Sequence, residues 1–266
     1  MTHQAGGWVR GRSSERPAHA EAIALRQGRI WRQVARSAPR LVLGLLFTLL
    51  TVVPASARLP RPKTDLGEVL SRMNDTAKHL KTVTADLDYT TVTVLVNDRS
   101  TESGRFYLRN PKNPEILIQF EKPDAKTILF RHNRAEIYYP KMKRLEEYNL
   151  ERQSGLVQQF LLLGFGTEQS ALKASYDVKL IGEEDLTGES AAVLELIPKQ
   201  PEISSQLSKV QLWVSEDSWV PVQQQFTQPG GDYLVARYKD TKVNRNVPSS
   251  TFHIEAGSDV ERVKKN

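Results

Sequence analysis

Alternation of apolar and polar residues with a period of two limits the possible folds of this chain more than any other feature. It begins at Thr82, where Leu87 and Tyr89 alternate with Asp86 and Asp88. Successive side chains of a β-strand point to opposite faces of the sheet. The pattern therefore predicts a long strand with one apolar face.

Further segments of the same kind follow, separated by short turns rich in Gly, Pro, Asn and Asp. Short connections favour an antiparallel meander. About ten or eleven strands in one sheet are expected to curl, which predicts a mostly β, α+β fold built on an unclosed antiparallel β-barrel. The predicted strands cover residues 82–95, 104–109, 115–121, 127–131, 135–139, 143–149, 176–182, 191–198, 209–215, 221–228 and 232–243, with a possible short one at 251–254.

An amphipathic helix is predicted before the first strand. Leu66 and Leu70 belong to a set of apolar residues that recur at steps of three and four. Asp65 is placed to cap the helix, with Glu68 three residues further on. The helix is expected to end near Lys81.

A second helix interrupts the strands at residues 154–166. Ser154 is placed to cap it and Gly164 to end it. The helix is apolar on nearly every side, and Phe160, Leu162 and Leu163 do not fit on one face together with their neighbours. We therefore predict a lid or a cavity lining, with ordinary core as the alternative.

The first 57 residues read as a leader. Arg36 and Arg40 precede an apolar run of 13 residues, 41–53, and the small residues Ala55 and Ala57 follow it. This order is typical of a secretory signal peptide, and we expect cleavage after Ala57. A membrane anchor is the alternative, but a spanning helix needs roughly 20 apolar residues. Residues 1–33 are either a disordered extension or the product of a misplaced start codon; residues 58–266 are expected to form one domain.

The charge of the chain argues against nucleic-acid binding. The leader holds eight arginines and two glutamates, which account for the whole formal charge of +6. Residues 58–266 are therefore formally neutral, whereas a nucleic-acid-binding domain should be basic. The chain has no cysteine, which excludes a disulfide scaffold and a thiolate site.

Residues that carry catalysis or bind metals do not form a recognisable pattern. His79, His132 and His253 lie far apart, with none of the short spacings of a zinc site. Ser154 lacks the glycine pattern of a nucleophile elbow. We predict no catalytic residues, no metal and no cofactor, so the protein is not expected to be an enzyme.

The ordered motifs of the mature chain resemble the bacterial outer-membrane lipoprotein carrier family, the LolA type, and its wider lipoprotein-sorting superfamily. The resemblance covers about residues 64–254. Its motifs are GRFYLRNP, ILIQFEKPD, IYYP, YDVKLIGEE, VLELIPK, VQLWV, WVPV and YKDTKVN, beginning at Gly104, Ile116, Ile137, Tyr176, Val193, Val210, Trp219 and Tyr238.

This resemblance implies an unclosed barrel with a helical lid over an apolar cavity that holds acyl chains. The residues expected to line the cavity or lid are Leu66, Leu70, Leu87, Tyr89, Phe106, Leu108, Ile116, Ile118, Phe120, Ile128, Phe130, Phe160, Leu162, Leu163, Leu194 and Trp213. In the family an Arg directly before the Pro of the motif that corresponds to GRFYLRNP helps to latch the lid. Here that position is Asn110, and Arg109 precedes it, so either the latch is altered or Arg109 replaces it.

The resemblance also implies partners and a location. It predicts a monomeric periplasmic carrier of lipoprotein acyl chains or other lipids. Such a carrier receives its cargo from an inner-membrane release complex and delivers it to an outer-membrane receptor. The alternative is a sensor or interaction module of the envelope that reads lipid or lipoprotein with the same cavity.

Overall fold

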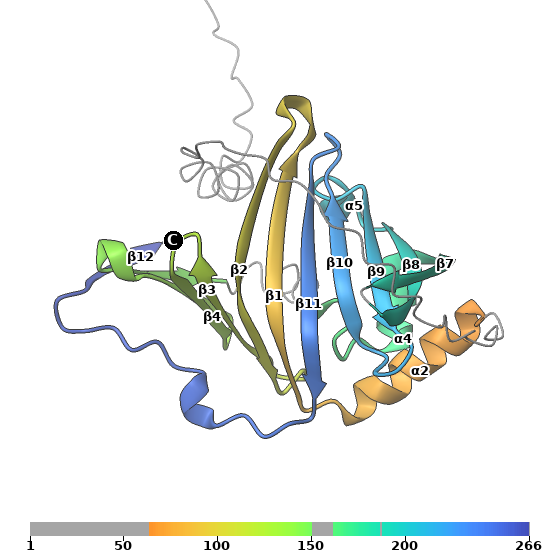
Figure 1. Cartoon of the computed structure of the whole chain (residues 1–266), viewed down its shortest axis with the longest axis horizontal. Helices are drawn as coiled ribbons and strands as arrows, with labels where there is room; N and C mark the ends of the chain where they lie inside the picture. The colour runs from red at the N-terminus through yellow and green to blue at the C-terminus, as the bar shows by residue number, and fades with distance from the viewer. Residues whose placement is uncertain (1–63, 151–161, 187, 266) are drawn as a thin grey trace, which may run out of the picture. The chain divides into compact units, whose positions relative to one another are not determined.

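One twelve-stranded sheet dominates the structure, which is a computed structural model that describes residues 64–150, 162–186 and 188–265 (Figure 1). The strands are β1 Thr82–Thr93, β2 Asp98–Arg109, β3 Glu115–Lys122, β4 Lys126–Arg131, β5 Arg134–Tyr139, β6 Arg144–Asn149, β7 Tyr176–Leu186, β8 Glu189–Pro198, β9 Lys209–Ser215, β10 Pro221–Thr227, β11 Tyr233–Val243 and β12 Glu261–Lys265.

Two antiparallel meanders make up the sheet. Strands β1 to β6 form one and β7 to β11 the other, and the long strands β1 and β11 pair between them. The strand order is β12-β6-β5-β4-β3-β2-β1-β11-β10-β9-β8-β7, so the sheet has two free edges and does not close. The predicted open, mostly β fold is confirmed, with twelve strands in place of ten or eleven.

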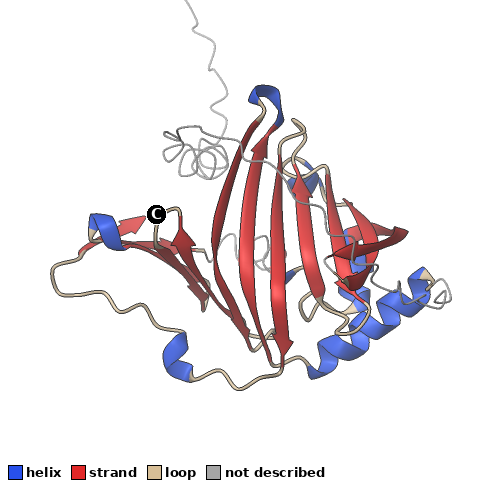
Figure 2. Ribbon diagram, viewed as in Figure 1, coloured by secondary structure: helices blue, strands red, loops and turns tan. Residues whose placement is uncertain are grey.

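The described α-helices lie towards the β7 end of the sheet (Figure 2). They are α2 Leu66–His79, α4 Gln169–Ser175 and α5 Pro201–Ser204, and the short 3₁₀ helices are η1 Val94–Val96, η2 Pro140–Met142 and η3 Ser249–Thr251. The Asp65 side chain caps α2 as predicted, because its Oδ1 accepts a hydrogen bond from the Glu68 amide at 2.8 Å. Val69, Leu70 and Met73 form the buried stripe of this helix.

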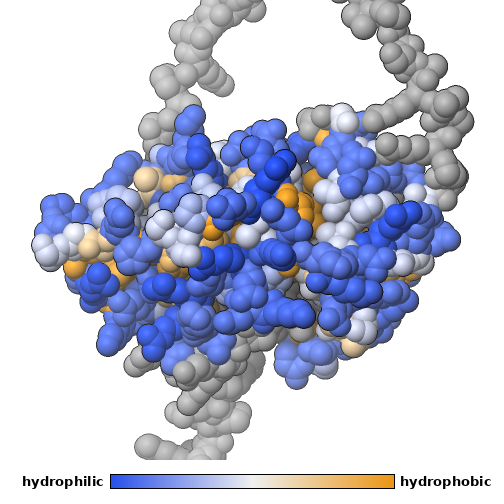
Figure 3. All heavy atoms as spheres, turned by 90° about the horizontal axis from the view of Figure 1, so that it is seen from below, coloured by the Kyte–Doolittle hydropathy of each residue, from blue (hydrophilic) through white to orange (hydrophobic). Residues whose placement is uncertain are grey.

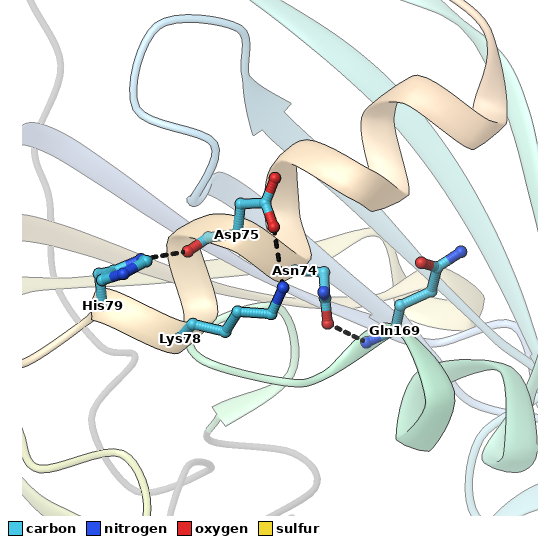
Figure 4. A network of polar contacts seen from close by, with 5 residues as sticks. All are labelled: Asn74, Asp75, Lys78, His79 and Gln169. Carbon is cyan, nitrogen blue, oxygen red and sulfur yellow. Dashed lines mark hydrogen bonds and ion pairs between the residues drawn. The ribbon is translucent and has the colours of Figure 1, made fainter.

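Helix α2 also holds the start of α4 in place (Figure 4). The Asn74 side-chain oxygen accepts a hydrogen bond from the Gln169 amide at 3.2 Å. On the same helix Lys78 pairs with Asp75 at 3.0 Å, and His79 Nδ1 lies 2.9 Å from the Asp75 carbonyl oxygen. The contact between Asn74 and Gln169 ties the two helices together across a long stretch of sequence.

Three elements differ from the sequence-based expectation. Strand β2 starts at Asp98 rather than at 104, because its polar first half pairs with β1 along the whole hairpin. Residues 251–254 are not a strand: Phe252 and Ile254 are buried against the sheet instead. The last strand is β12, which pairs in parallel with β6 and has no apolar alternation to reveal it.

Candidate functional site

The two faces of the sheet can be told apart by register, since directly opposed residues share a face. One row of opposed residues runs from β2 to β8 through Glu102, Tyr89, Ala236, Gln224, Leu212 and Leu194. We call the face that carries this row the inner face and the opposite one the outer face. Seen from below, hydrophobic residues emerge in separate patches within a largely hydrophilic surface (Figure 3).

Most residues predicted to line the cavity lie on or against the inner face. The fully buried ones are Leu70, Leu87, Phe106, Leu108, Ile116, Ile118, Phe120, Leu163 and Leu194. Leu66, Tyr89, Ile128, Phe130 and Leu162 are partly buried beside them. Phe160, like most of the predicted apolar helix, lies outside the described residues. The structure therefore separates a buried set, which acts as core, from a partly buried set concentrated on β1 and β4.

Coverage of the inner face is uneven. Helix α2 packs on the β8 to β10 part, where Leu70 and Met73 join Leu194 and Leu212 in one cluster. Over β2 to β5 the buried cluster of the inner face contains no residue of α2, and Ile128 and Phe130 of β4 are only partly buried there. This partly exposed stretch is the candidate binding surface.

A short segment, Leu162–Gly166, joins the two halves of the inner face. Leu163 packs with the α2 cluster and Phe165 with the cluster around β1 and β2. The Phe165 ring lies 5.5 Å from the Phe106 ring and 5.0 Å from the Tyr238 ring, measured between centroids. Gly164 has a φ of +84°, as expected for a glycine that ends a helix.

Two buried polar side chains hold this segment on the sheet. Gln224 Nε2 donates to the Leu163 carbonyl at 2.6 Å, and the Tyr238 hydroxyl donates to Gln224 Oε1 at 2.9 Å. Burial raises the pKa of Tyr238, so its hydroxyl remains a donor. Sequence analysis did not single out either residue, although the alternation of β11 already placed Tyr238 on the same face as Ala236.

A buried ion pair lies within the apolar inner face, where Lys126 Nζ contacts both carboxylate oxygens of Glu102 at 2.9 and 3.1 Å. The Phe120 ring centre lies 4.6 Å from the same ammonium group. Burial raises the pKa of Glu102 and lowers the pKa of Lys126, and in each the partner's charge opposes this effect. Desolvation therefore outweighs attraction, and the pair stabilises the fold little.

The proposed latch residues do not form a latch in the described part of the chain. Arg109 lies on the outer face, because Leu108 before it points inward. Its guanidinium pairs with Glu115 and stands 4.6 Å from the centre of the Phe252 ring. Asn110 is exposed and turns the chain after β2 with a φ of +51°, a conformation that Asn adopts more readily than most residues.

Trp213, which was expected to line the cavity, lies on the outer face instead. It is opposed to Val193 and packs with Ala191 and Val222 on the outer face, while its neighbour Leu212 points inward. Its indole Nε1 donates to Glu184 Oε2 at 2.7 Å. Because neighbouring strand residues point to opposite faces, Leu212 and Trp213 are not able to line the same cavity.

A polar cleft of about 400 Å³ lies beside α2. Its lining residues are Arg72, Asp75, Thr76, His79, Ser218, Trp219, Val243 and Asn244. The Arg72 guanidinium stands 5.8 Å from the centre of the Trp219 ring. Six of these eight side chains are polar or charged, and the apolar ones are Trp219 and Val243.

Within residues 64–150, 162–186 and 188–265, no group of three or more His, Cys, Asp or Glu side chains is placed to hold a metal ion. None of the helices in these ranges has both the length and the apolar character that a membrane crossing requires.

Comparison with known proteins gives a family match and several similar folds. A family model described as uncharacterized protein matches residues 113–254. No curated protein sequence matches the chain significantly.

Crystal structures with a similar fold come from several bacteria. An uncharacterized conserved protein from Thermus thermophilus has 13% identity and a TM-score of 0.48, with 75% of this chain and 98% of that chain covered. The lipoprotein LppX from Mycobacterium tuberculosis has 13% identity and a TM-score of 0.43, with 69% and 99% covered. A LolA superfamily protein from Nitrosomonas europaea has 14% identity and a TM-score of 0.34, with 72% and 99% covered.

The family match extends over more than half of the sequence. The chain therefore belongs to the family of uncharacterized proteins that this model describes.

Proposed function

We propose that this protein is an envelope carrier that binds acyl chains of lipids or lipoproteins on the inner face of its sheet. The observation that carries the proposal is the apolar inner face of β2 to β5, which extends beyond the part packed against α2. Phe120 and Ile128 stand there with Phe130, two of the three only partly buried. An apolar surface of this kind favours an apolar ligand.

The rest of the proposal follows the motifs of the sequence. Residues 1–57 act as a cleaved leader, and residues 58–266 form a monomeric carrier domain in the periplasm. An inner-membrane release complex supplies the cargo and an outer-membrane receptor accepts it. No catalytic step is required, since the protein only binds and releases.

Reversible binding sets a limit on how much of the ligand is buried. Each CH₂ group that leaves water contributes about 0.8 kcal/mol, so full burial of a palmitoyl chain contributes roughly 12 kcal/mol. A carrier that gained all of this energy would release its cargo too slowly. An open sheet leaves one side of the bound acyl chain in contact with water. The affinity is therefore lower than for full burial, as transfer of the ligand requires.

Ile128→Asp tests the proposed binding surface. Ile128 lies between Ile118 and Ile137 in the register of β3, β4 and β5, and it is partly buried. A carboxylate there faces the acyl chain without a partner and costs several kcal/mol. The affinity for a fluorescent fatty acid should fall at least about tenfold, which corresponds to about 1.4 kcal/mol.

The matched control is Thr127→Asp, which adds the same charge on the same strand but on the outer face. The affinity of this control for the fluorescent fatty acid should stay within about twofold of that of the unmodified protein. Circular dichroism of both variants checks that the sheet is retained. If Ile128→Asp is folded and binds the fatty acid as well as the unmodified protein, the inner face is not the binding surface.

A further inference from the structure

Polar residues lie near one end of the inner face on β2 and on β4 to β6, while β3 carries Phe120 opposite Lys126. The register of β4 and β5, which opposes Thr127 to Tyr138, brings Lys126 next to Tyr139 on the other face, and Tyr139 is opposed to Arg144 of β6. Glu102 of β2 joins these residues through its ion pair with Lys126, and Glu146 of β6 through its ion pair with Arg144 at 3.0 Å. We call Glu102, Lys126, Tyr139, Arg144 and Glu146 the polar row.

The row borders the apolar binding surface on the same strands. Two positions away from Lys126 on β4 and from Tyr139 on β5, the inner face carries Ile128 and Ile137, which are opposed to each other. Phe120 of β3 is opposed to Lys126. On β3 to β5 the apolar field therefore borders polar groups at the Lys126 end, and Glu146 of β6, which is opposed to Ile137, borders it from the side. An apolar field beside polar groups is the arrangement expected for a ligand with an apolar chain and a polar headgroup.

Charge in this region is unbalanced towards the positive. Glu102 and Lys126 neutralise each other. Glu146 contacts two cations, Arg144 at 3.0 Å and Lys265 of β12 at 3.7 Å, so three cations face two carboxylates. One additional negative charge would balance the cluster.

One hydrogen-bond donor of the row is unsatisfied. Arg144 Nε is buried from solvent, and no group of the described chain accepts a hydrogen bond from it. A buried donor without an acceptor costs free energy that an anionic oxygen would recover. Beside it, burial raises the pKa of the Tyr139 phenol to about 12, helped by the charges of Glu146 and Glu102, so the hydroxyl keeps its proton and can donate.

We propose that the polar row binds the anionic headgroup, a carboxylate or a phosphate, of an acyl ligand whose chain lies on the apolar field of β3 to β5. This inference rests on the proposed acyl-chain binding and names the class of ligand. Arg144 donates from its guanidinium to the headgroup oxygen, and Tyr139 donates its hydroxyl. The Glu102–Lys126 pair marks the boundary between headgroup and chain.

The test compares three ligands with the same hydrocarbon chain: palmitate, palmitoyl lysophosphatidic acid and the uncharged alcohol hexadecanol. Each displaces a fluorescent acyl probe from the protein, which gives its affinity. At least one of the two anionic ligands should bind at least about tenfold more tightly than hexadecanol, the lower end of what one charged hydrogen bond contributes. A preference for palmitate alone identifies a carboxylate site, and a preference for the lysophospholipid alone a phosphate site.

Arg144→Met removes the donors but keeps an unbranched side chain that still fills the space. It should reduce the preference for the anionic ligand to less than about twofold and leave the affinity for hexadecanol unchanged. The matched control is Arg131→Met on β4. Arg131 pairs with Glu136 at 3.4 Å and its side chain is 34% exposed, against 33% for Arg144, but it follows the inward-pointing Phe130 and so lies on the outer face. This control should keep the full preference.

The outcomes separate the two proposals. Equal binding of all three ligands, or an unchanged preference in folded Arg144→Met, overturns the headgroup site and leaves acyl-chain binding standing. If none of the ligands displaces the probe and the probe itself does not bind, the proposed function is wrong and the headgroup site falls with it.

Discussion

Phe165→Ala is expected to lower the free energy of unfolding by about 3–5 kcal/mol, the cost of removing a fully buried aromatic ring. The ring has no exposed surface and contacts two other rings, those of Phe106 and Tyr238. It is also one of the contacts that hold the Leu162–Gly166 segment on the inner face, together with the hydrogen bond from Gln224 to the Leu163 carbonyl. Urea denaturation followed by circular dichroism measures the change.

Ile181→Ala serves as the control for this substitution. Ile181 is a large apolar residue of β7 that is 49% exposed. Its truncation should change the free energy of unfolding by less than about 1 kcal/mol. If Phe165→Ala is no more destabilising than the control, the segment is not anchored as described.

Lys126→Met should destabilise the fold by about 3–5 kcal/mol near pH 7, because it leaves a buried carboxylate without its partner. Only 13% of the Glu102 side chain is exposed. Burial already raises the pKa of Glu102, with Lys126 opposing the effect, so removal of Lys126 raises the pKa further. A carboxyl group whose pKa is higher in the folded than in the unfolded protein favours folding when protonated. The loss should therefore be smaller near pH 5 than near pH 7.

The double variant Glu102→Gln with Lys126→Met controls for the change in shape. Because neither side chain is charged, the double variant should recover most of the free energy of unfolding that Lys126→Met loses at pH 7. It should also lack the additional pH dependence of Lys126→Met. Chemical denaturation at the two pH values measures both effects. The buried position of the Glu102–Lys126 pair is contradicted if Lys126→Met is equally destabilised at pH 5 and pH 7. It is also contradicted if Lys126→Met is as stable as the unmodified protein at pH 7.

The sequence alone was sufficient to predict most of the fold. Alternation with a period of two located β1, whose first half has one buried face. Strands β3 and β8 were also located to within a few residues, as apolar segments between turns, and both are buried on two faces over part of their length. Strand β12 could not be predicted in this way, since its sequence ERVKK is charged and its partner β6 is distant in the chain. The first half of β2 was missed for a related reason: it is held by pairing with β1 and not by burial.

The candidate site was predicted less completely than the fold. Alternation assigns residues of one strand to two faces, and it placed Leu87 and Tyr89 together correctly. It does not show which predicted residues become closed core, as Leu194 does, and which stay partly exposed, as Ile128 does. For Leu194 that difference depends on the packing of α2. Trp213 lies on the outer face because it is adjacent to the inward-pointing Leu212.

The site predicted from the sequence also lacked the buried polar groups. Gln224 and Lys126 lie buried on the inner face at positions that the alternation already defines, but the sequence-based prediction included neither. A polar residue in phase with apolar neighbours, such as Lys126 two positions before Ile128, indicates a buried polar contact or a binding group. The same pattern would have identified Tyr139 and Arg144 as members of one row.

Photo-crosslinking tests the central claim, acyl-chain binding on the inner face, most directly. A palmitate analogue with a diazirine on its chain is irradiated with the purified protein, and the labelled peptides are mapped by mass spectrometry. The account predicts labels on inner-face residues of β3 and β4, above all at Ile128 and Phe130, and competition by excess palmitate. Labelling confined to the outer face, or labelling that palmitate does not reduce, would contradict it.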